Sequence, residues 1–451
     1  MRFSSLGKSL MVRALLAGSV LLATPALAKP QREWIDPLTH HRVLRISDMP
    51  GTSSLYFTQS AFTPQGDKMV MKTPQGIAVV TLKDWSVKLL VPGPQLNLLF
   101  TGHKSRNVYY ASRARDDAGQ TFQVYAADVD TGKVKKVADV AGGSIGSINA
   151  DETMLLGQYT LPPANVNPDG TLKHPAQKGG NETPGGYTYA ENRPDGTPYT
   201  YADAKTRALH RRLIANIPME IFTHNLVTGE RKVIVASSDW LNHVQFSPTD
   251  PGLIMYCHEG PWHEVDRIWT IRTDGTGKKL VHTRTMNNEI AGHEFFSPDG
   301  HTIWYDLQTP RGEVFWLAGY DINSGKRTWY KVDRNQWSVH YNQSNDLKLF
   351  TGDGGDSEMV AHAPDGKYLY LFTPKPIPDD AEIPTADAEK LIVPGTFAQE
   401  KLVDMRKHNY KTEPNMTFTP DGKWIIFRGH FENDPDEHGT HVYAVEVAKA
   451  Q

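Results

Sequence analysis

Cysteine, long apolar runs and excess charge are all scarce in this sequence, and each shortage excludes a class of protein. Cys257 is the single cysteine among 451 residues, so no intramolecular disulfide can form. The apolar run at residues 14–23 is much shorter than the roughly 20 residues of a membrane-spanning helix, so no membrane anchor is expected. The net charge of −3 gives no reason to expect nucleic acid as a partner.

The first residues have the order of a signal peptide. A basic stretch with Arg2, Lys8 and Arg13 precedes the apolar run. A small-residue cleavage signal, Ala26-Leu27-Ala28, follows it. We therefore expect residues 1–28 to be removed and the mature protein to be periplasmic or secreted. Loss of the three basic residues would change the net charge from −3 to −6.

Helical periodicity is also nearly absent, and a repeat takes its place. The clearest copies are Phe246-Ser247-Pro248, Phe296-Ser297-Pro298-Asp299-Gly300 and Phe418-Thr419-Pro420-Asp421-Gly422. Including weaker copies, the first position of the signal falls at residues 62, 100, 148, 246, 296, 343 and 418. A spacing of about 40 to 50 residues is typical of a four-stranded propeller blade. The sequence thus predicts an all-β fold, a seven-bladed β-propeller, with eight blades as the alternative because residues 362–366 resemble another start signal.

The expected domain is a single propeller over residues 29–451, with loop insertions at 160–215 and 373–400. Residues 203–213, inside the first insertion, have a helical pattern. Residues 42–47 are expected to supply the outer strand of the last blade, beside residues 441–446. Closure of this kind removes exposed sheet edges.

A second repeated feature lies three residues before each signal. The residues at this register position are Gln59, Asn97, Ile145, His243, His293, His340 and Asn415. In a circular arrangement these side chains converge on the axis, on the face that also carries the loops after the second strand of each blade. A lone histidine beside a strand is usually structural, but three in successive blades favour a functional site. Cys257, which ends an apolar strand, is expected to be a buried small hydrophobe rather than a thiol nucleophile.

Several motifs together resemble the oligogalacturonate lyases. They are His243, His258-Glu259-Gly260-Pro261, Gly292-His293-Glu294-Phe295-Phe296, Ser338 to His340, Gly352-Asp353-Gly354 and Pro414 to Pro420. The resemblance implies a seven-bladed propeller that cleaves short pectic fragments by β-elimination. It also implies a manganese-type divalent cation at the mouth of the channel.

The resemblance assigns roles to residues as follows. His243 matches the proposed catalytic base, and His293 matches one metal ligand. The family's other ligands, Gln-x-x-His-x-His, fall on Tyr410, Glu413 and Asn415. The resemblance implies Mn²⁺, and oxygen donors in place of imidazoles make the site harder, so Ca²⁺ and Mg²⁺ are the alternatives.

The resemblance leaves the remaining site residues less defined. Arg211 is the candidate for a catalytic arginine, and Arg212 and Arg311 are candidates for substrate binding. His258, His340 and Gln59 are the other expected substrate-binding residues. The expected partner is an oligosaccharide that contains uronic acids, whose carboxylates arginine can bind bidentately.

β-Elimination suits these residue types, because a neutral histidine can remove the C5 proton of a uronate whose carboxylate is neutralised by a cation. Two alternatives remain open. The altered segment at Tyr410, Glu413 and Asn415 is compatible with a non-catalytic periplasmic propeller that binds glycans or proteins. A glycoside hydrolase would need two carboxylates, for which Glu259, Glu294, Asp353 and Glu413 are candidates.

Overall fold

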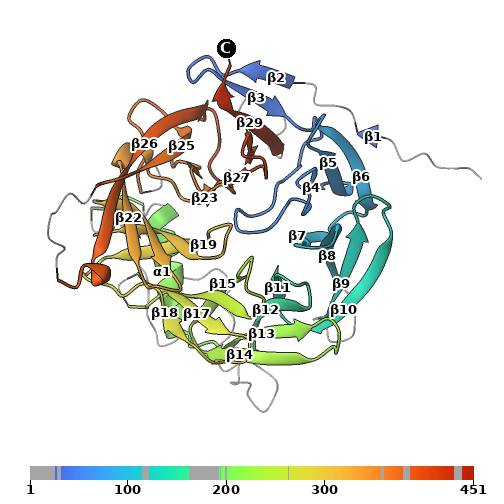
Figure 1. Ribbon diagram of the computed structural model, residues 1–451, viewed down its shortest axis with the longest axis horizontal. Coiled ribbons are helices and arrows are strands. Elements are labelled where there is room, and N and C mark those ends of the chain that lie inside the picture. The colour runs from blue at the N-terminus through green and yellow to red at the C-terminus, as the bar shows by residue number, and fades with distance from the viewer. Residues whose placement is uncertain are drawn as a thin grey trace, which may run out of the picture.

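The chain is described by a computed structural model that covers residues 26–27, 32–113, 121–161, 192, 195–198, 201–262, 264–356, 360–378, 386–430 and 439–450. Its strands are arranged radially around one axis, as Figure 1 shows. The predicted signal peptide falls outside the described residues except for β1 (Ala26–Leu27), which pairs with β6 (Ser86–Pro92). No helix within the described ranges is long and apolar enough to span a membrane.

Seven blades follow one another along the chain, as the repeat predicts. Blade 1 has an irregular inner segment, bridged at Ser53 and Phe62, and then β4 (Lys68–Thr73), β5 (Gly76–Thr81) and β6. Blade 2 has β7 (Asn97–Thr101), β8 (Asn107–Arg113), β9 (Thr121–Asp128) and β10 (Val134–Ala141). Blade 3 has β11 (Ser144–Ile148), β12 (Met154–Thr160), β13 (Met219–Asn225) and β14 (Arg231–Ser237). Blade 4 has β15 (Trp240–Phe246), β16 (Leu253–Glu259), β17 (Ile268–Arg272) and β18 (Lys279–Leu280).

The other three blades complete the circle. Blade 5 has β19 (Ile290–Phe296), β20 (Thr302–Gln308), β21 (Phe315–Asp321) and β22 (Arg327–Val332). Blade 6 has β23 (Tyr341–Gln343), β24 (Phe350–Gly352), β25 (Tyr368–Pro376) and β26 (Ile392–Asp404). Blade 7 has β27 (Thr417–Phe418), β28 (Trp424–Gly429), β29 (His441–Lys449) and β3 (His41–Arg45), with β2 (Arg32–Ile35) outside it.

The amino-terminal strand closes the ring of blades, as predicted. β3 pairs antiparallel with β29, with Leu44 opposite Ala444 and Val43 opposite Val445. The alternative of eight blades is excluded because residues 363–366 form a tight bridge between β24 and β25 instead of starting a blade.

The two predicted insertions differ in structure. Helix α1 (Tyr201–Ile214) lies where the helical pattern of the first insertion predicted it. Much of the second range, 373–400, is strand rather than loop, because β25 and β26 extend through it. The start of β26 pairs in parallel with β22, and this pairing joins blades 5 and 6 into one eight-stranded sheet. Short 3₁₀ turns at Arg334–Gln336 and Ala388–Lys390 complete the described elements.

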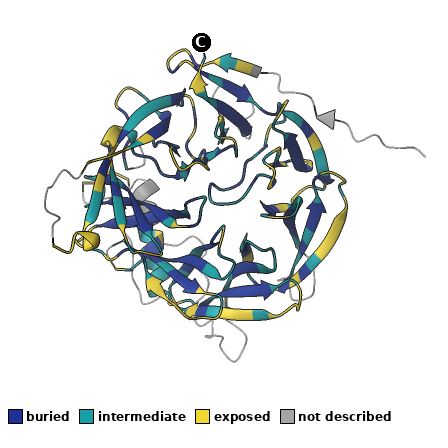
Figure 2. Cartoon of the chain, in the orientation of Figure 1, coloured by how far each residue is buried: buried dark blue, intermediate teal, exposed yellow. Residues whose placement is uncertain are grey.

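The core is divided among the blade interfaces. Within the described residues, buried apolar side chains form clusters between neighbouring blades, and the one that closes the circle joins Met71 and Val80 of blade 1 to Ile426 and Ala444 of blade 7. Figure 2 shows the same layering, with buried strands towards the middle and exposed residues gathered at the periphery. Because each blade packs on two neighbours, the fold holds a rigid frame around the axis.

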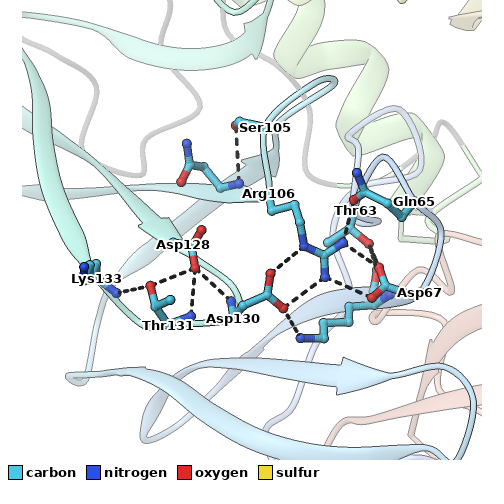
Figure 3. Close-up of polar contacts among 11 residues, drawn as sticks. Thr63, Gln65, Asp67, Ser105, Arg106, Asp128, Asp130, Thr131 and Lys133 are labelled. Carbon is cyan, nitrogen blue, oxygen red and sulfur yellow. Dashed lines mark hydrogen bonds and ion pairs between the residues drawn. The ribbon is translucent and has the colours of Figure 1, made fainter.

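Charged residues also connect neighbouring blades, and Figure 3 shows one such contact between blades 1 and 2. The Arg106 guanidinium donates to both oxygens of Asp67, at 2.8 and 2.9 Å, and to both oxygens of Asp130, at 2.5 and 3.1 Å. Lys68 also pairs with Asp130. The adjacent hairpin turn is of the Asp-x-x-Thr-Gly type, in which Asp128 accepts hydrogen bonds from the Thr131 backbone and hydroxyl.

Candidate active site

The register position has an unusual backbone conformation in three blades. His243, His293 and Asn415 all lie in the left-handed region, with φ of 48°, 53° and 51°. In β15 and β19 the strand register shifts at these residues, between Asn242 and Gln245 and between Gly292 and Phe295. β-Bulges of this kind re-aim side chains and are common beside active sites. The register position therefore shares one local backbone geometry in these three blades.

His243 lies between two buried carboxylates. Its Nδ1 is 3.1 Å from Glu294 Oε1, and its Nε2 is 4.0 Å from Glu259 Oε2. Asn242 donates to Glu259 Oε2 at 2.7 Å and accepts a hydrogen bond from Gln158, so the Glu259 carboxylate is held in place. The three functional side chains come from β15, β16 and β19, which places this cluster at the junction of blades 4 and 5.

The electrostatics of this cluster make the His243 imidazole a stronger base. Burial lowers the pKa of His243, but the neighbouring Glu294 and Glu259 carboxylates raise that pKa by more, so its net shift is upward. The cationic Arg267 opposes this effect. Arg267 is itself buried, donates to the Gly260 carbonyl at 3.1 Å and stacks over the Trp262 ring at 4.0 Å.

A second cluster surrounds His340. Asp353 accepts hydrogen bonds from the backbone N–H and from ring Nδ1 of His340, both at 2.8 Å. The other ring nitrogen, Nε2, lies 3.9 Å from Glu413 Oε2 and 3.3 Å from the Tyr56 hydroxyl. The His293 and His340 rings meet edge to face with centroids 5.0 Å apart. The structure thus brings together His293, His340 and Glu413 from three successive blades.

Tyr56 and Phe57 reach the axis from the inner segment of blade 1, which Figure 1 shows as a loop directed into the middle of the ring. Asn415 Oδ1 accepts from the Phe57 backbone N–H at 3.4 Å, and Asn342 donates to the Phe57 carbonyl at 3.4 Å. Burial raises the pKa of Tyr56 well above its usual value, and the surrounding carboxylates, Glu413 first among them, raise it further. The Tyr56 hydroxyl is therefore protonated and can act as a hydrogen-bond donor.

Phe57 separates the histidine clusters from a cavity farther along the axis. Its ring packs against His340 at 4.7 Å and Phe295 at 5.9 Å between centroids, and it also lines a cavity of about 280 Å³. The other walls of that cavity include aromatic residues of the repeated signal, Phe100, Phe246, Phe296 and Phe418. Gln59, an expected substrate-binding residue, lines this cavity and accepts a hydrogen bond from the Tyr56 backbone at 3.2 Å.

Three other expected site residues have structural partners. His258 faces away from His243, because side chains alternate along β16, and its Nδ1 lies 2.8 Å from Asp239 Oδ2. Tyr410 lies beneath the His340 cluster and donates its hydroxyl to the Asp353 carbonyl at 2.9 Å. Asn415 is fully buried, and its two amide atoms contact the backbone of Phe57 and Glu413.

The expected arginines lie on or beside α1. Arg212 donates to the Met219 sulfur at 3.0 Å and lies 5.9 Å from the Trp240 ring, while Arg311 donates to Thr206 of the helix at 3.3 Å. These contacts place α1 beside β15 and the blade-5 loop. Arg211 occupies the same last turn of α1, and its catalytic role stays a prediction.

The structure adds residues that sequence reasoning did not assign to the site. Arg428 donates to the Glu413 carbonyl at 2.7 Å and to Ser53 at 3.1 Å, and burial lowers its pKa. Tyr56 gave no signal in the repeat because the inner segment of blade 1 is not a regular strand. Glu259 and Glu294, by contrast, stand beside histidines in recognisable motifs, which is the signal that identifies them.

The thiol of Cys257 has the properties of a buried group. Its side chain is inaccessible, and burial raises the pKa of Cys257 well above its usual value. A neutral thiol is a poor nucleophile, which supports the structural interpretation over nucleophilic catalysis.

The donor atoms around His340 suit a hard divalent cation. Asp353 holds Nδ1, which leaves the lone pair of the ring on Nε2, and the separation of 3.9 Å between Nε2 and Glu413 Oε2 is compatible with two ligands of one ion. His293 offers a second imidazole beside them. Tyr410 fits this role poorly, because its hydroxyl is already a donor to Asp353 and burial raises its pKa well above the usual value.

Sequence comparison relates the second half of the chain to known enzymes. Residues 201–447, more than half of the chain, match the family described as oligogalacturonate lyase. The chain is 30% identical over 218 residues to an oligogalacturonide lyase of Pectobacterium atrosepticum and 27% identical over 219 residues to an oligogalacturonate lyase of Dickeya dadantii. In each case the aligned part covers 47% of this chain and 52% of the relative, so the chain spans about half the length of these relatives.

Two solved structures share the fold over almost the whole chain. One is an oligogalacturonate lyase in complex with manganese, with a TM-score of 0.67 at 21% identity. The other is an oligogalacturonate lyase from Vibrio parahaemolyticus, with a TM-score of 0.65 at 19% identity. Each alignment covers 94% of this chain and 99% of the other. The sequence match includes blades 4 to 7, which supply His243, His293, His340 and Glu413, and on this basis the chain belongs to the oligogalacturonate lyase family.

Proposed function

We propose that the protein cleaves short uronate oligosaccharides, of the oligogalacturonate type, by β-elimination at the axial face of blades 4 to 7. The observation that carries this proposal is the position of His243, with a carboxylate on Nδ1 and a hard-donor cluster close by. Membership of the oligogalacturonate lyase family supports the choice of substrate.

His243 is the base in this proposal. A neutral imidazole donates Nδ1–H to Glu294, which fixes the tautomer and leaves the Nε2 lone pair available. Nε2 then removes the proton at C5 of the sugar, which is acidified by the adjacent carboxylate group once that group is neutralised. The electron pair of the C5–H bond forms the C4=C5 double bond as the C4–O bond breaks, and the leaving sugar takes up a proton at that oxygen. The Glu294 carboxylate stabilises the imidazolium that forms, in the way a carboxylate supports histidine in other base-catalysed reactions.

The cation in this proposal is held by His293, His340 and Glu413, and Mn²⁺ is the ion favoured by the manganese complex of the structural relative. When bound, the cation supplies positive charge to the substrate carboxylate and so stabilises the charge that develops at C5. The need for it follows from the local charge. Glu259, Glu294, Asp353 and Glu413 all lie around Tyr56, and they would repel an anionic sugar.

Arginines and Tyr56 bind the rest of the substrate in this proposal. Arg428 lies beside Glu413, and Arg212 and Arg311 lie where α1 contacts β15 and the blade-5 loop. Guanidinium groups bind uronate carboxylates bidentately, which orients the sugar ring. Tyr56, which stays protonated, donates to a sugar or carboxylate oxygen near His340. We further propose export of the protein, on the strength of the signal-peptide pattern in residues 1–28.

The test is incubation of the purified protein with digalacturonate and trigalacturonate, with and without Mn²⁺. The proposal predicts products with a new double bond or its keto-acid tautomer, detected by ultraviolet absorbance and by a keto-acid assay. Saturated sugars as products would identify a glycoside hydrolase instead. Saturable binding without turnover, for galacturonate, glucuronate and mixed uronate oligomers, would identify a binding protein and contradict the proposal.

A further inference from the structure

Three different metal-ligating side chains meet at one place, and one of them is the proposed base. A ring nitrogen of His243, the sulfur of Cys257 and a carboxylate oxygen of Glu294 all lie within 4.8 Å of one another. They come from β15, β16 and β19. The pairing of Asn242 with Cys257 places β16 directly beside the bulge that carries His243. Cys257 and Glu259 share one face of β16, on the opposite side from His258.

The Glu294 carboxylate independently points to a ligand at this place. Its side chain has no exposed surface, and Oε1 is directed to His243 Nδ1 at 3.1 Å. Oε2 is buried and has no hydrogen-bond partner in the described part of the chain, and the neighbouring Cys257 thiol is the other polar group that contacts this carboxylate. A buried carboxylate oxygen without a partner is costly, so an additional positive group beside Glu294 would stabilise the folded protein.

We propose that His243, Cys257 and Glu294 form a second cation site, which is selective for thiophilic divalent ions such as Zn²⁺. Imidazole, thiolate and carboxylate are the three protein ligand types of zinc, and a water molecule completes a four-coordinate site. The hard-donor cluster of His293, His340 and Glu413 has no sulfur and suits Mn²⁺ instead. One chain would therefore hold two neighbouring cation sites of different chemical preference.

The coordination step is balanced in protons and charge. As the sulfur–metal bond forms, Cys257 releases its thiol proton to solvent, and the neutral His243 ring keeps its single proton on the nitrogen that does not bind the ion. The thiolate and the carboxylate then neutralise the divalent ion. Glu259, 4.0 Å from His243 Nε2, lies where a carboxylate can support the ring of a metal-bound histidine.

Occupancy of this site has a consequence that rests on the proposed function. A cation bound to His243 removes the base that takes the C5 proton, so a thiophilic ion inhibits the lyase reaction even when Mn²⁺ is present. The second site would act as a switch that responds to zinc, separate from the cation required for turnover.

Cobalt(II) provides the direct test of binding, because a cobalt–thiolate bond has a near-ultraviolet charge-transfer band. Cys257 is the only cysteine, so such a band in the folded protein can come from no other residue. The proposal predicts one band-forming equivalent per chain, displacement by Zn²⁺, and loss of the band in Cys257→Ser. A folded wild-type protein that takes up Co²⁺ without this band, or takes up none, would overturn the proposal.

Inhibition is tested with Mn²⁺-loaded protein titrated with Zn²⁺. Cys257→Ser and Cys257→Ala should retain turnover, and Zn²⁺ should inhibit them at least about tenfold more weakly than the wild type. Two substitutions are used because one of them could fail to fold, and thermal unfolding identifies the folded variant. Equal inhibition of wild type and a folded variant would overturn the inhibitory role. A cobalt–thiolate band in a protein without lyase activity would support the cation site while refuting the proposed function.

Discussion

Asp353 accepts two hydrogen bonds from one residue, His340, whose backbone N–H and ring Nδ1 both lie at 2.8 Å from the carboxylate. Because a carboxylate only accepts, both nitrogens of His340 that face it must be donors. The tautomer is thereby fixed, and Nε2 is left as an acceptor beside Tyr56 and Glu413. This is the arrangement in which a carboxylate orients a metal-binding histidine.

The substitution Asp353→Asn tests that arrangement. An amide can accept from only one of the two nitrogens and presents a donor to the other, so His340 should lose its fixed orientation. We expect a roughly 10- to 100-fold loss of Mn²⁺ affinity, the usual effect of removing such a partner. The measurement is Mn²⁺ binding followed by electron paramagnetic resonance, which does not depend on activity.

Asp356→Asn is the matched control. Asp356 lies on the same loop but pairs with Lys367 at 3.2 Å. Its substitution should leave Mn²⁺ affinity unchanged. If both variants lost affinity equally, the loop as a whole, rather than the His340–Asp353 pair, would be responsible.

Substitutions of His293 and His243 are predicted to have different effects. His293→Ala should lower Mn²⁺ content and turnover together, with partial recovery at millimolar Mn²⁺, because it removes a ligand. His243→Ala should keep Mn²⁺ and lose about 10²- to 10⁴-fold in turnover, the usual contribution of a general base. Metal analysis and steady-state rates on both variants check this. Full Mn²⁺ occupancy in His293→Ala, or a near-normal rate in His243→Ala, would show that the roles belong to other residues.

The sequence could predict the repeat and the convergence of its register position, because both depend on local patterns. The closing strand at residues 42–47 pairs as predicted, whereas the left-handed backbone of His243, His293 and Asn415 has no signal in the repeat. His258 could not be placed in the same way. Strand alternation directs it to Asp239, and the sequence alone does not say which face of β16 meets blade 5.

Tyr56 and Tyr410 show the other limit of prediction. Tyr56 reaches the axis because the inner segment of blade 1 leaves the strand path between its bridges at Ser53 and Phe62. Tyr410 occupies the position of a family ligand in the sequence, yet its hydroxyl is directed to Asp353. Both outcomes depend on long-range packing across the ring, for which no local signal exists.

Phe57 is predicted to maintain both stability and the geometry of the site. It is almost fully buried between Phe295 and His340. Phe57→Ala should cost about 3 to 5 kcal/mol of unfolding free energy, typical of a large-to-small substitution in a core. Turnover should fall as well, because the ring that supports His340 is removed. Phe57→Leu should cost less than about 1.5 kcal/mol.

Phe62→Ala provides the comparison for Phe57. Phe62 lines the same axial cavity, but it is only partly buried and packs at the junction of blades 1 and 7. The Phe62→Ala variant should have a lower free energy of unfolding than the wild type and the same kcat/KM. Denaturant unfolding and steady-state kinetics on the three variants separate the two effects. Unchanged kcat/KM in a folded Phe57→Ala protein would remove Phe57 from the support of the site.

Arg106 is predicted to make a pH-dependent contribution to stability. Its hydrogen bonds lower the pKa of Asp67 to about 2 and hold the pKa of Asp130 well below the usual range. A lowered carboxyl pKa gives stability that is fully present above the ordinary value of about 4 and is lost as pH falls from there towards 2.

Arg106→Met should therefore cost about 1 kcal/mol at pH 7, since the network is partly exposed and screened by solvent. The difference from the wild type should shrink at pH 3 and in 1 M salt. Urea unfolding at pH 7, 5 and 3 measures this, with Lys136→Met, which removes an exposed pair with Asp139, as a control expected to have a smaller effect than Arg106→Met. A cost for Arg106→Met that does not change between pH 7 and pH 3 would mean that the side chain acts through packing, because a charge effect must shrink once the pH falls below the ordinary carboxyl pKa of about 4.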